Sequence, residues 1–458
     1  MISFRPLSRL IIALSIAVTA FLSMPTKADA QGLIRDAEIE GILRDYTNPI
    51  LVAAGLRPED VGLYLINDPS LNAFVANGQR IHLHTGLIIA AETPGQLLGV
   101  IAHETGHIAG AHGVLRARDA RIAARPGLVS IGLGIMAIAA GAPDAGAALI
   151  ASSQQFSAIN FFQHTRAQEA TADQLAVDYL TKTNQSSQGL IEFFEKFRYQ
   201  EVLSEQRRYP YFRSHPLASD RIRSLRERAE ETGLLDVEST PAQIAQMEVM
   251  HAKLIGFLEP PVRVFQRYPP EDLSQPARYA RSISAMQSAD LTTAIREIDS
   301  LIEETPGNPF YHELKGQILF ESGRAAESVE PLENAIELLP NQPLILIAYA
   351  RSLIARNEEG DVERGEQALR DALIAEPNNA FAWAQLATAL ETQGFRSEAQ
   401  LATAESRYHV GDYPRAYSFA TRAMRDLEPG TANFRRAGDI RNATDPALPE
   451  NEIFWRRR

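Results

Sequence analysis

Two histidines and a glutamate stand close together in the run His103–His107, which reads His-Glu-Thr-Gly-His. On a helix of 3.6 residues per turn, the two histidines lie on the same face, so that both imidazoles can bind one metal ion. Glu104 would stand beside that ion as general base for a water molecule. The spacing favours one Zn²⁺ per chain and hydrolytic chemistry, the alternative being two unrelated surface histidines.

The residues before this run predict the helix that such a site needs. Thr93 can cap a helix, Pro94 suits its first position, and Gln96 completes a capping box. The apolar run 97–102 then leads directly into the motif. We therefore expect a buried helix to carry both histidines.

A catalytic zinc ion normally has three protein ligands and one open position. His112 is near in sequence, but on a continuing helix it points ~140° away from His107 and cannot share the metal. Glu169 is the better candidate for the third ligand. Asp173, one turn beyond it, could accept the ring N–H of a ligating histidine and fix its tautomer. An acidic pair on a helix surface is the alternative for these two residues.

The overall composition excludes several classes of function. The chain has a formal charge of −12, and residues 1–30 carry three cations and one anion, so residues 31–458 are at −14. Such an acidic protein would repel phosphate backbones, and we expect no nucleic-acid partner. The absence of cysteine excludes disulfides, thiolate metal sites and cysteine nucleophiles.

The first thirty residues predict an export signal. Arg5 and Arg9 precede the apolar run 10–22, and Ala28 and Ala30 have the spacing of a cleavage site. The run is shorter than the ~20 residues that span a bilayer, so we expect cleavage after Ala30, with an uncleaved membrane anchor as the alternative. The periplasm of a Gram-negative bacterium is the expected location, and secretion to the medium is the alternative.

Residues 31–258 are predicted to form one domain, in which Asn77 and Gly78 connect the segments 71–75 and 80–84 as a β-hairpin. The proline-rich stretch 259–275 is predicted to be a stiff linker. The segment 127–151 is rich in glycine, alanine and leucine but too short to span a membrane. Core packing is its favoured interpretation, with a mobile lid or peripheral membrane contact as alternatives.

The C-terminal half of the chain repeats itself. Small residues at positions 294, 328 and 365 are each followed twelve residues later by a proline. This pattern is typical of tetratricopeptide repeats, which are pairs of antiparallel helices of about 34 residues. We predict an α-solenoid over 276–430, with an ill-defined tail over 431–458, and a plain helical bundle as the alternative.

The metal motif, Glu169 with Asp173, and the run Ser214-His215-Pro216 followed by Arg221 together resemble the M48 family of zinc peptidases. The strand expected before the metal helix is also similar to that family. The resemblance implies a gluzincin-like α+β domain, mostly helical, in front of the solenoid. It further implies an endopeptidase that acts on unfolded or misassembled outer-membrane and other envelope proteins, with a part in their assembly and contact with the assembly machinery through the repeats.

Two roles are open for His215. Pro216 favours extended backbone before it, so the ring can project from a loop toward the metal. His215 would either stabilise the oxyanion of the tetrahedral intermediate or bind zinc as a fourth ligand in a latent enzyme. Arg221 would assist the first role or anchor the loop in an ion pair.

The predicted hairpin offers a way to bind substrate. Its edge residues Ala73, Phe74 and Val75 could pair with an extended peptide by strand addition, which gives affinity without strong sequence preference. A rival hypothesis is a periplasmic chaperone or scaffold with a structural or seldom active zinc site. Hydrolysis of a small substrate fits the repeats poorly.

Overall fold

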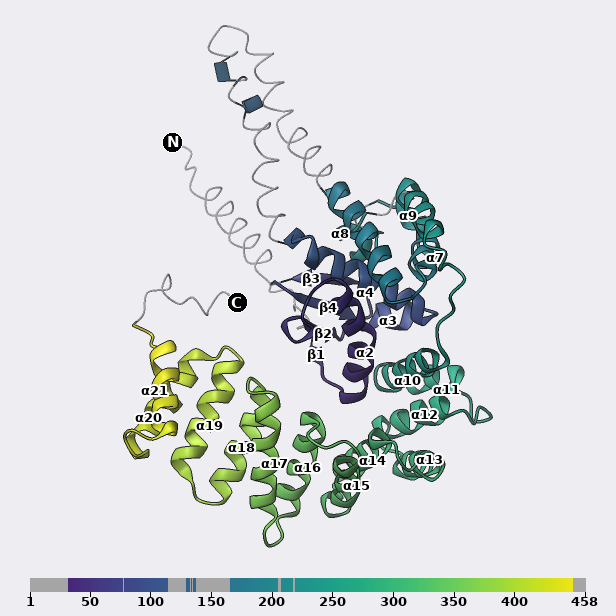
Figure 1. The fold of residues 1–458 in the computed structure, drawn as a ribbon. Coiled ribbons are helices and arrows are strands. Elements are labelled where there is room, and N and C mark those ends of the chain that lie inside the picture. The colour runs from purple at the N-terminus through teal and green to yellow at the C-terminus, as the bar shows by residue number, and fades with distance from the viewer. Residues whose placement is uncertain are drawn as a thin grey trace, which may run out of the picture.

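The computed structural model describes residues 32–76, 78–113, 129–131, 133, 135–136, 165–204, 207–216 and 219–447. The predicted signal at 1–30 and residues 448–458 of the predicted tail lie outside these ranges. The predicted class, α+β and mostly helical, is confirmed: a small sheet and its helices form an N-terminal unit, and a repeated array of helices curves below it (Figure 1). Within the described ranges, no helix combines the length and the apolar character that a membrane span requires.

The sheet of the N-terminal unit has four strands in the order β1-β2-β4-β3, with β2 parallel to β4. The strands are β1 Leu33–Ile34, β2 Gly62–Ile66, β3 Ala73–Ala76 and β4 Arg80–His84. The predicted hairpin is present, since β3 and β4 are antiparallel neighbours and Gly78 has φ +93°. Asn77 is outside the described residues. β3 is an edge strand of this sheet, which places residues 73–75 at the edge expected from the sequence.

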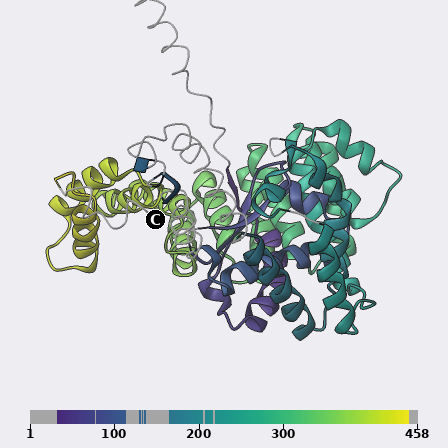
Figure 2. The ribbon, with the colours of Figure 1, turned by 90° about the horizontal axis from the view of Figure 1, so that it is seen from above.

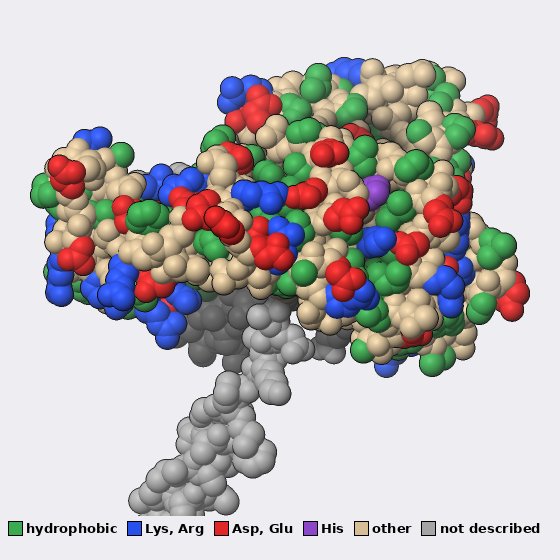
Figure 3. Space-filling model, turned by 90° about the horizontal axis from the view of Figure 1, so that it is seen from below, with side chains coloured by type: hydrophobic (Ala, Val, Ile, Leu, Met, Phe, Trp, Pro, Cys, Tyr) green, Lys and Arg blue, Asp and Glu red, His purple; other side chains and the backbone are tan. Residues whose placement is uncertain are grey.

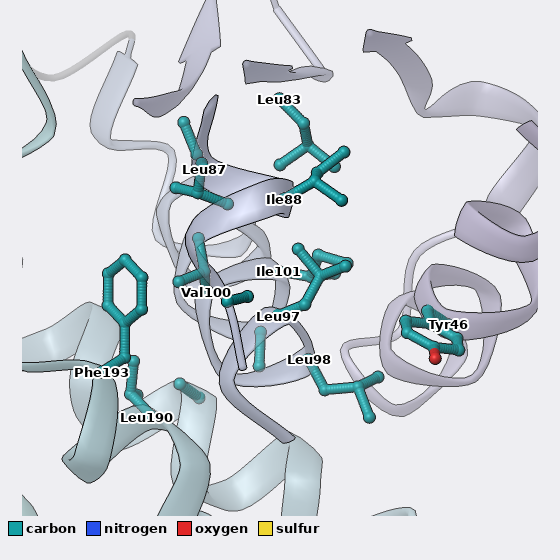
Figure 4. Close-up of a cluster of buried hydrophobic side chains, with 14 of the residues drawn as sticks. Tyr46, Leu83, Leu87, Ile88, Leu97, Leu98, Val100, Ile101, Leu190 and Phe193 are labelled. Carbon is teal, nitrogen blue, oxygen red and sulfur yellow. The ribbon is translucent and has the colours of Figure 1, made fainter. Parts of the chain in front are cut away.

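Helices surround the sheet and make up most of the unit. They are α2 Ala37–Ala53, η1 Pro58–Asp60, α3 Thr85–Ala90, α4 Pro94–Ala109, a helix over 165–182, α7 Gln188–Lys196, η2 Arg198–Val202, α8 Pro210–Ser214, α9 Ser219–Glu231 and α10 Pro241–Leu258. The central helix is α4, whose apolar side chains face β4 and α3 on one side and α2 and α7 on the others (Figure 4). Burial of this apolar surface fixes the helix that carries the metal motif.

The stretch predicted to be a linker instead contains a packed helix, α11 Pro261–Arg267. Val264 of α11 is buried in one cluster with Ile255 of α10 and Tyr279 of the next helix, α12 Gln275–Gln287. Helix α10 is shared, because its Met250 belongs to the core around α4. Proline is favourable at the first position of a helix, so Pro261 begins α11 where the sequence was interpreted as a break.

The array beyond α11 consists of successive helices, each packed against the next. They are α12 Gln275–Gln287, α13 Leu291–Glu304, α14 Pro309–Glu321, α15 Ala325–Leu338, α16 Pro343–Arg356, α17 Asp361–Ala375, α18 Ala380–Thr392, α19 Arg396–His409, α20 Tyr413–Asp426 and α21 Ala432–Ala443. Ser328 is buried at a helix crossing and its hydroxyl lies 2.8 Å from that of Ser352. The predicted tail therefore begins with a helix, α21, whose Ile440 is buried against α20. Seen from above, the last helices project to one side of the N-terminal unit (Figure 2).

The array also touches the N-terminal unit through α17, a helix more than 100 residues beyond α10 in the chain. The guanidinium of Arg35, directly after β1, lies 2.6 Å from Glu376 at the end of α17 and 2.6 Å from Glu40. Acidic and basic side chains are interspersed on the face seen from below (Figure 3). This partly exposed ion pair is a second contact between the array and the N-terminal unit.

Most of the segment 127–151 lies outside the described residues. Four of its described apolar residues have between 47% and 60% of their surface exposed to solvent: Val129, Leu133, Ile135 and Met136. At these four positions the favoured interpretation, core packing, is wrong.

Candidate metal centre

Helix α4 presents the two motif histidines inside the protein, His103 fully buried and His107 5% exposed. Thr93 caps the helix through its side-chain oxygen, as predicted. Gln96 does not complete the predicted capping box, because its side chain accepts a hydrogen bond from the backbone N–H of Glu92, one residue further back. The Thr93 side chain nevertheless accepts a hydrogen bond from the backbone N–H of Gln96, one of the donors that have no partner within the helix.

The second acidic segment lies directly against this helix. A Cβ atom at Gly106 would lie 2.8 Å from the carbonyl oxygen of Ala172, so the glycine within the motif allows the two backbones to touch. Ala172 belongs to the helix over 165–182, which also carries Glu169 and Asp173. Close backbone packing therefore delivers both acids to the histidines, although more than 60 residues separate them in the chain.

Four buried side chains form a group that could hold one metal ion: His103, His107, Glu169 and His215, whose ligand atoms all lie within 4.8 Å of one another. The Nε2 atoms of His103 and His107 are 3.1 Å apart. His103 Nε2 is 3.4 Å from Glu169 Oε2, and His107 Nε2 is 3.5 Å from Glu169 Oε1. Two ligands of one tetrahedral zinc are separated by roughly 3.3 Å, given zinc–nitrogen distances of about 2.0–2.1 Å. The donor set and its spacing therefore fit zinc.

Glu104 is fully buried beside this group. Neither of its carboxylate oxygens has a hydrogen-bond partner in the described part of the chain. Its neighbour on this side is His215, whose Nε2 lies 3.5 Å from Glu104 Oε1. A buried carboxylate without partners is costly unless another group satisfies it. A water molecule at a metal site is such a group, which agrees with a general base and not with a ligand.

Asp173 lies behind His103, where the sequence predicted it. Its Oδ1 is 3.0 Å from His103 Nδ1, the ring nitrogen that points away from His107. Arg221 donates to the same carboxylate at 2.8 Å, and its Nη1 lies 3.1 Å from Glu169 Oε2. The contacts of Arg221 are those of an ion-pair anchor.

The electrostatics of the group follow from burial and these ion pairs. Burial disfavours the charged form of His103, but hydrogen bonds to Asp173 and Glu169 prevail and raise its pKa to about 9. Burial and the charge of His103 hold the pKa of His107 well below its usual value. Burial opposes ionisation of Glu169 and Asp173, yet the neighbouring cations, Arg221 among them, lower the pKa of both carboxyls. Both acids are therefore ionised.

His215 follows helix α8 and is 3% exposed. Its Nδ1 lies 3.3 Å from His103 Nε2 and 3.1 Å from Glu169 Oε2, among the other ligand atoms. Its ring lies next to that of Tyr211, with centroids 4.8 Å apart and the ring planes inclined by 32°. Sequence reasoning missed Tyr211, whose hydroxyl is buried without a hydrogen-bond partner in the described ranges. Its spacing of four residues from His215 was the only available signal.

His112 is the second residue that sequence reasoning missed. It is not part of the four-residue group found among the described residues, and its ring does not point away from His107. The two Nδ1 atoms are 2.9 Å apart. The expectation assumed a continuing helix, whereas α4 ends at Ala109 and Ala111 turns the chain with φ +51°.

Comparison with known proteins agrees with this geometry. The family model described as Peptidase family M48 matches residues 35–229. The beta-barrel assembly-enhancing protease of Escherichia coli (strain K12) is 24% identical over 377 residues, which cover 80% of this chain and 75% of that protein. The beta-barrel assembly-enhancing protease of Yersinia pestis is 24% identical over 410 residues, which cover 87% of this chain and 82% of that protein.

A further relative matches a smaller part of the chain. The metalloprotease YcaL of Escherichia coli (strain K12) is 28% identical over 178 residues, which cover 37% of this chain and 62% of that protein. The family match and the buried group of three histidines and a glutamate lead to one conclusion. Residues 35–229 form a domain that matches peptidase family M48, and this domain is a metallopeptidase whose cofactor is zinc.

Proposed function

We propose that this protein is a zinc endopeptidase of the bacterial periplasm that cleaves misassembled outer-membrane or other envelope proteins and also assists their assembly. The observation that carries the peptidase mechanism is the buried group of His103, His107 and Glu169 beside Glu104, whose carboxylate accepts no hydrogen bond from the described residues. The choice of client is supported by the names of the relatives that match most of the chain.

In this proposal His103, His107 and Glu169 hold the ion. Bound zinc supplies Lewis-acid polarisation of the scissile carbonyl and lowers the pKa of a water molecule to about 7. Glu104 accepts the proton of the attacking water and later delivers it to the leaving amine. Burial of Glu104 keeps bulk water from competing for its carboxylate.

Asp173 and Arg221 hold the ligands in place. The Asp173 carboxylate faces His103 Nδ1, which leaves Nε2 of the same ring for the metal. Arg221 binds Asp173 and approaches Glu169, so one guanidinium orients the acids on both sides of His103. Arg221 thereby acts through the ligands, and substrate contact is not required of it.

His215 is the group that decides between a latent and an active site. Its Nδ1 lies among the ligand atoms, which supports a resting state with His215 as a fourth ligand. Four protein ligands around zinc leave no open position for water. His215 would have to leave this position before cleavage, and it could then donate to the oxyanion of the tetrahedral intermediate.

Two surfaces serve substrate binding in this proposal. Among the described strands β3 has only β4 as neighbour, and its other edge, with Phe74 and Val75 partly exposed, would pair with an extended segment of the client. The helical array would select the protein that presents the segment and would contact the outer-membrane assembly machinery.

The experiment that tests the proposal measures cleavage of an unfolded outer-membrane β-barrel protein by the purified chain and by Glu104→Gln. We expect the variant to retain about one zinc per chain and to lose at least ~10²-fold in rate, because the base is lost and the ligands remain. Glu59→Gln is the matched control, since it removes an exposed carboxylate. An unchanged rate in Glu104→Gln would refute the mechanism. Loss of cleavage with full retention of assembly activity would support the chaperone hypothesis as a second role.

A further inference from the structure

His112 lies on the side of His107 that faces away from the metal group. Its side chain is buried, with only 5% of the residue exposed. The Nδ1 atoms of the two rings are 2.9 Å apart, and the rings meet edge to face with centroids 4.9 Å apart. A nitrogen–nitrogen distance of this length is a hydrogen bond, in which one ring donates and the other accepts.

The backbone after α4 is shaped to deliver this ring. Gly110 caps the helix, and Ala111 adopts a left-handed conformation that is unusual for a residue other than glycine. A Cβ atom at Gly110 would lie 2.5 Å from His112 Nε2. The ring of His112 therefore occupies the space that a side chain at position 110 would need. The left-handed backbone at Ala111 and the absence of a side chain at Gly110 together favour a single position of the His112 ring.

The direction of the hydrogen bond follows from the metal group. His107 Nε2 faces His103 Nε2 at 3.1 Å and Glu169 Oε1 at 3.5 Å, so Nε2 is its ligand nitrogen. A neutral imidazole that binds metal through Nε2 carries its proton on Nδ1. His107 must then donate to His112 Nδ1, and His112 must carry its own proton on Nε2.

We infer that His112 is a positioning residue that holds the tautomer and ring orientation of the zinc ligand His107. The inference rests on the proposed role of His107 as ligand. His112 does for His107 what Asp173 does for His103, but it is a neutral acceptor. Each histidine ligand thus has a hydrogen-bond acceptor at its Nδ1: the Asp173 carboxylate for His103 and the His112 imidazole for His107.

Formal charges explain why the second acceptor is neutral. Among the described residues, the buried carboxylates of Glu104, Glu169 and Asp173 face one guanidinium, that of Arg221. With neutral histidine ligands, a dication brings the formal charge of these groups to zero. A further carboxylate at position 112 would leave one uncompensated charge in the interior, which is costly. An imidazole accepts the hydrogen bond without adding that charge.

The test compares His112→Asn with His112→Leu, two side chains of similar shape of which only Asn has an acceptor near the position of Nδ1. The readout is the affinity for Zn²⁺ itself, measured by competition with a chromophoric chelator. We expect His112→Leu to bind zinc about 10–100-fold more weakly and His112→Asn to stay within a few-fold of the unaltered protein. Equal affinities of the two variants, whether both weakened or both unchanged, would overturn the inference.

A second pair of variants leaves the imidazole in the sequence. Gly110→Ala should displace the ring of His112 and weaken zinc binding, whereas Gly113→Ala should have no effect because its Cβ would meet nothing within 4 Å. In zinc-loaded protein with ¹⁵N-labelled histidine, the Nδ1–H proton of His107 should show a hydrogen-bonded low-field shift that His112→Leu removes. A shift that persists in His112→Leu, or equal zinc affinity of the two glycine variants, would also overturn the inference.

These readouts separate the inference from the proposed function. Failure of Glu104→Gln to reduce cleavage would refute the peptidase mechanism without changing the zinc affinities. Full zinc affinity in His107→Ala would show that His107 is not a ligand, and the inference would fall with it. Circular dichroism of each variant confirms that the measured affinities belong to folded protein.

Discussion

The ion pair of Lys253 offers a sharp test of how the array is held to the N-terminal unit. The Lys253 side chain is 5% exposed, and its Nζ lies 2.8 Å from Asp36 Oδ2 and 3.2 Å from Glu38 Oε2. Both acids lie at the start of α2, whereas Lys253 is on α10, which also packs against α12. Burial lowers the pKa of Lys253, but the two acids prevail and raise it, so the ammonium is charged in the folded protein.

Lys253→Met keeps the length of the side chain and removes the charge. Removal of one partner from a buried ion pair costs about 3–5 kcal/mol, because the other charge stays buried without compensation. Glu38 can relieve part of this cost by taking up a proton, since burial already raises its pKa. We therefore expect a loss of about 3 kcal/mol in the free energy of unfolding. An unfolding entropy of about 0.9 kcal/mol/K for roughly 430 residues that unfold together converts this loss into a Tm lower by about 3 °C.

The assay is differential scanning calorimetry of both proteins at pH 7, with Lys196→Met as the matched control. Lys196 Nζ lies 2.6 Å from Glu92 Oε1, but the two side chains are 32% and 68% exposed. Exposed pairs contribute about 0–1 kcal/mol, so the control should lower Tm by about 1 °C or less. Equal shifts in the two variants would refute the reasoning, because burial would then add nothing to the Lys253 pair.

Two further predictions concern pH and latency. Burial raises the pKa of Glu313 to about 7. Between pH 4.5 and pH 7 the folded protein therefore retains a proton that the unfolded chain releases. The free energy of unfolding should fall by up to about 3 kcal/mol over this pH range. Glu313→Gln should abolish this loss, and a Tm difference from the unaltered protein that is constant over this range would contradict it. His215→Ala should keep its zinc and retain or increase basal cleavage if His215 occupies the open position of the metal at rest. A ~10²-fold loss of rate would instead indicate oxyanion stabilisation.

The local part of the site could be predicted from the sequence, because its geometry follows from helix periodicity. His103 and His107 share a face of α4, and the Thr93 cap begins that helix. The hairpin of β3 and β4 was equally local, since the turn at Gly78 fixes its register. Glu169 could be selected only by elimination, since its position depends on the backbone contact between Gly106 and Ala172.

The errors over His112 and Pro261 arose where a helix ends or starts. His112 was placed on a continuing helix, and a single left-handed residue, Ala111, was enough to reverse its direction. Helix ends are uncertain by one or two residues in any sequence-based assignment, and one residue turns a side chain by about 100°. Pro261 was interpreted as part of a linker, although proline is also common at the first position of a helix. Only burial against neighbouring helices distinguishes the two cases.

Arg221 shows how the structure narrows a choice that the sequence left open. An oxyanion donor needs N–H groups that are free to face substrate. The guanidinium of Arg221 instead binds both oxygens of Asp173, donates to the carbonyl oxygen of Pro216 at 3.2 Å and approaches Glu169. These contacts connect the carboxylate behind His103 with the residue that follows His215. Arg221 is thus better suited to fixing the distance between the zinc ligands and the His215 loop than to contacting the transition state.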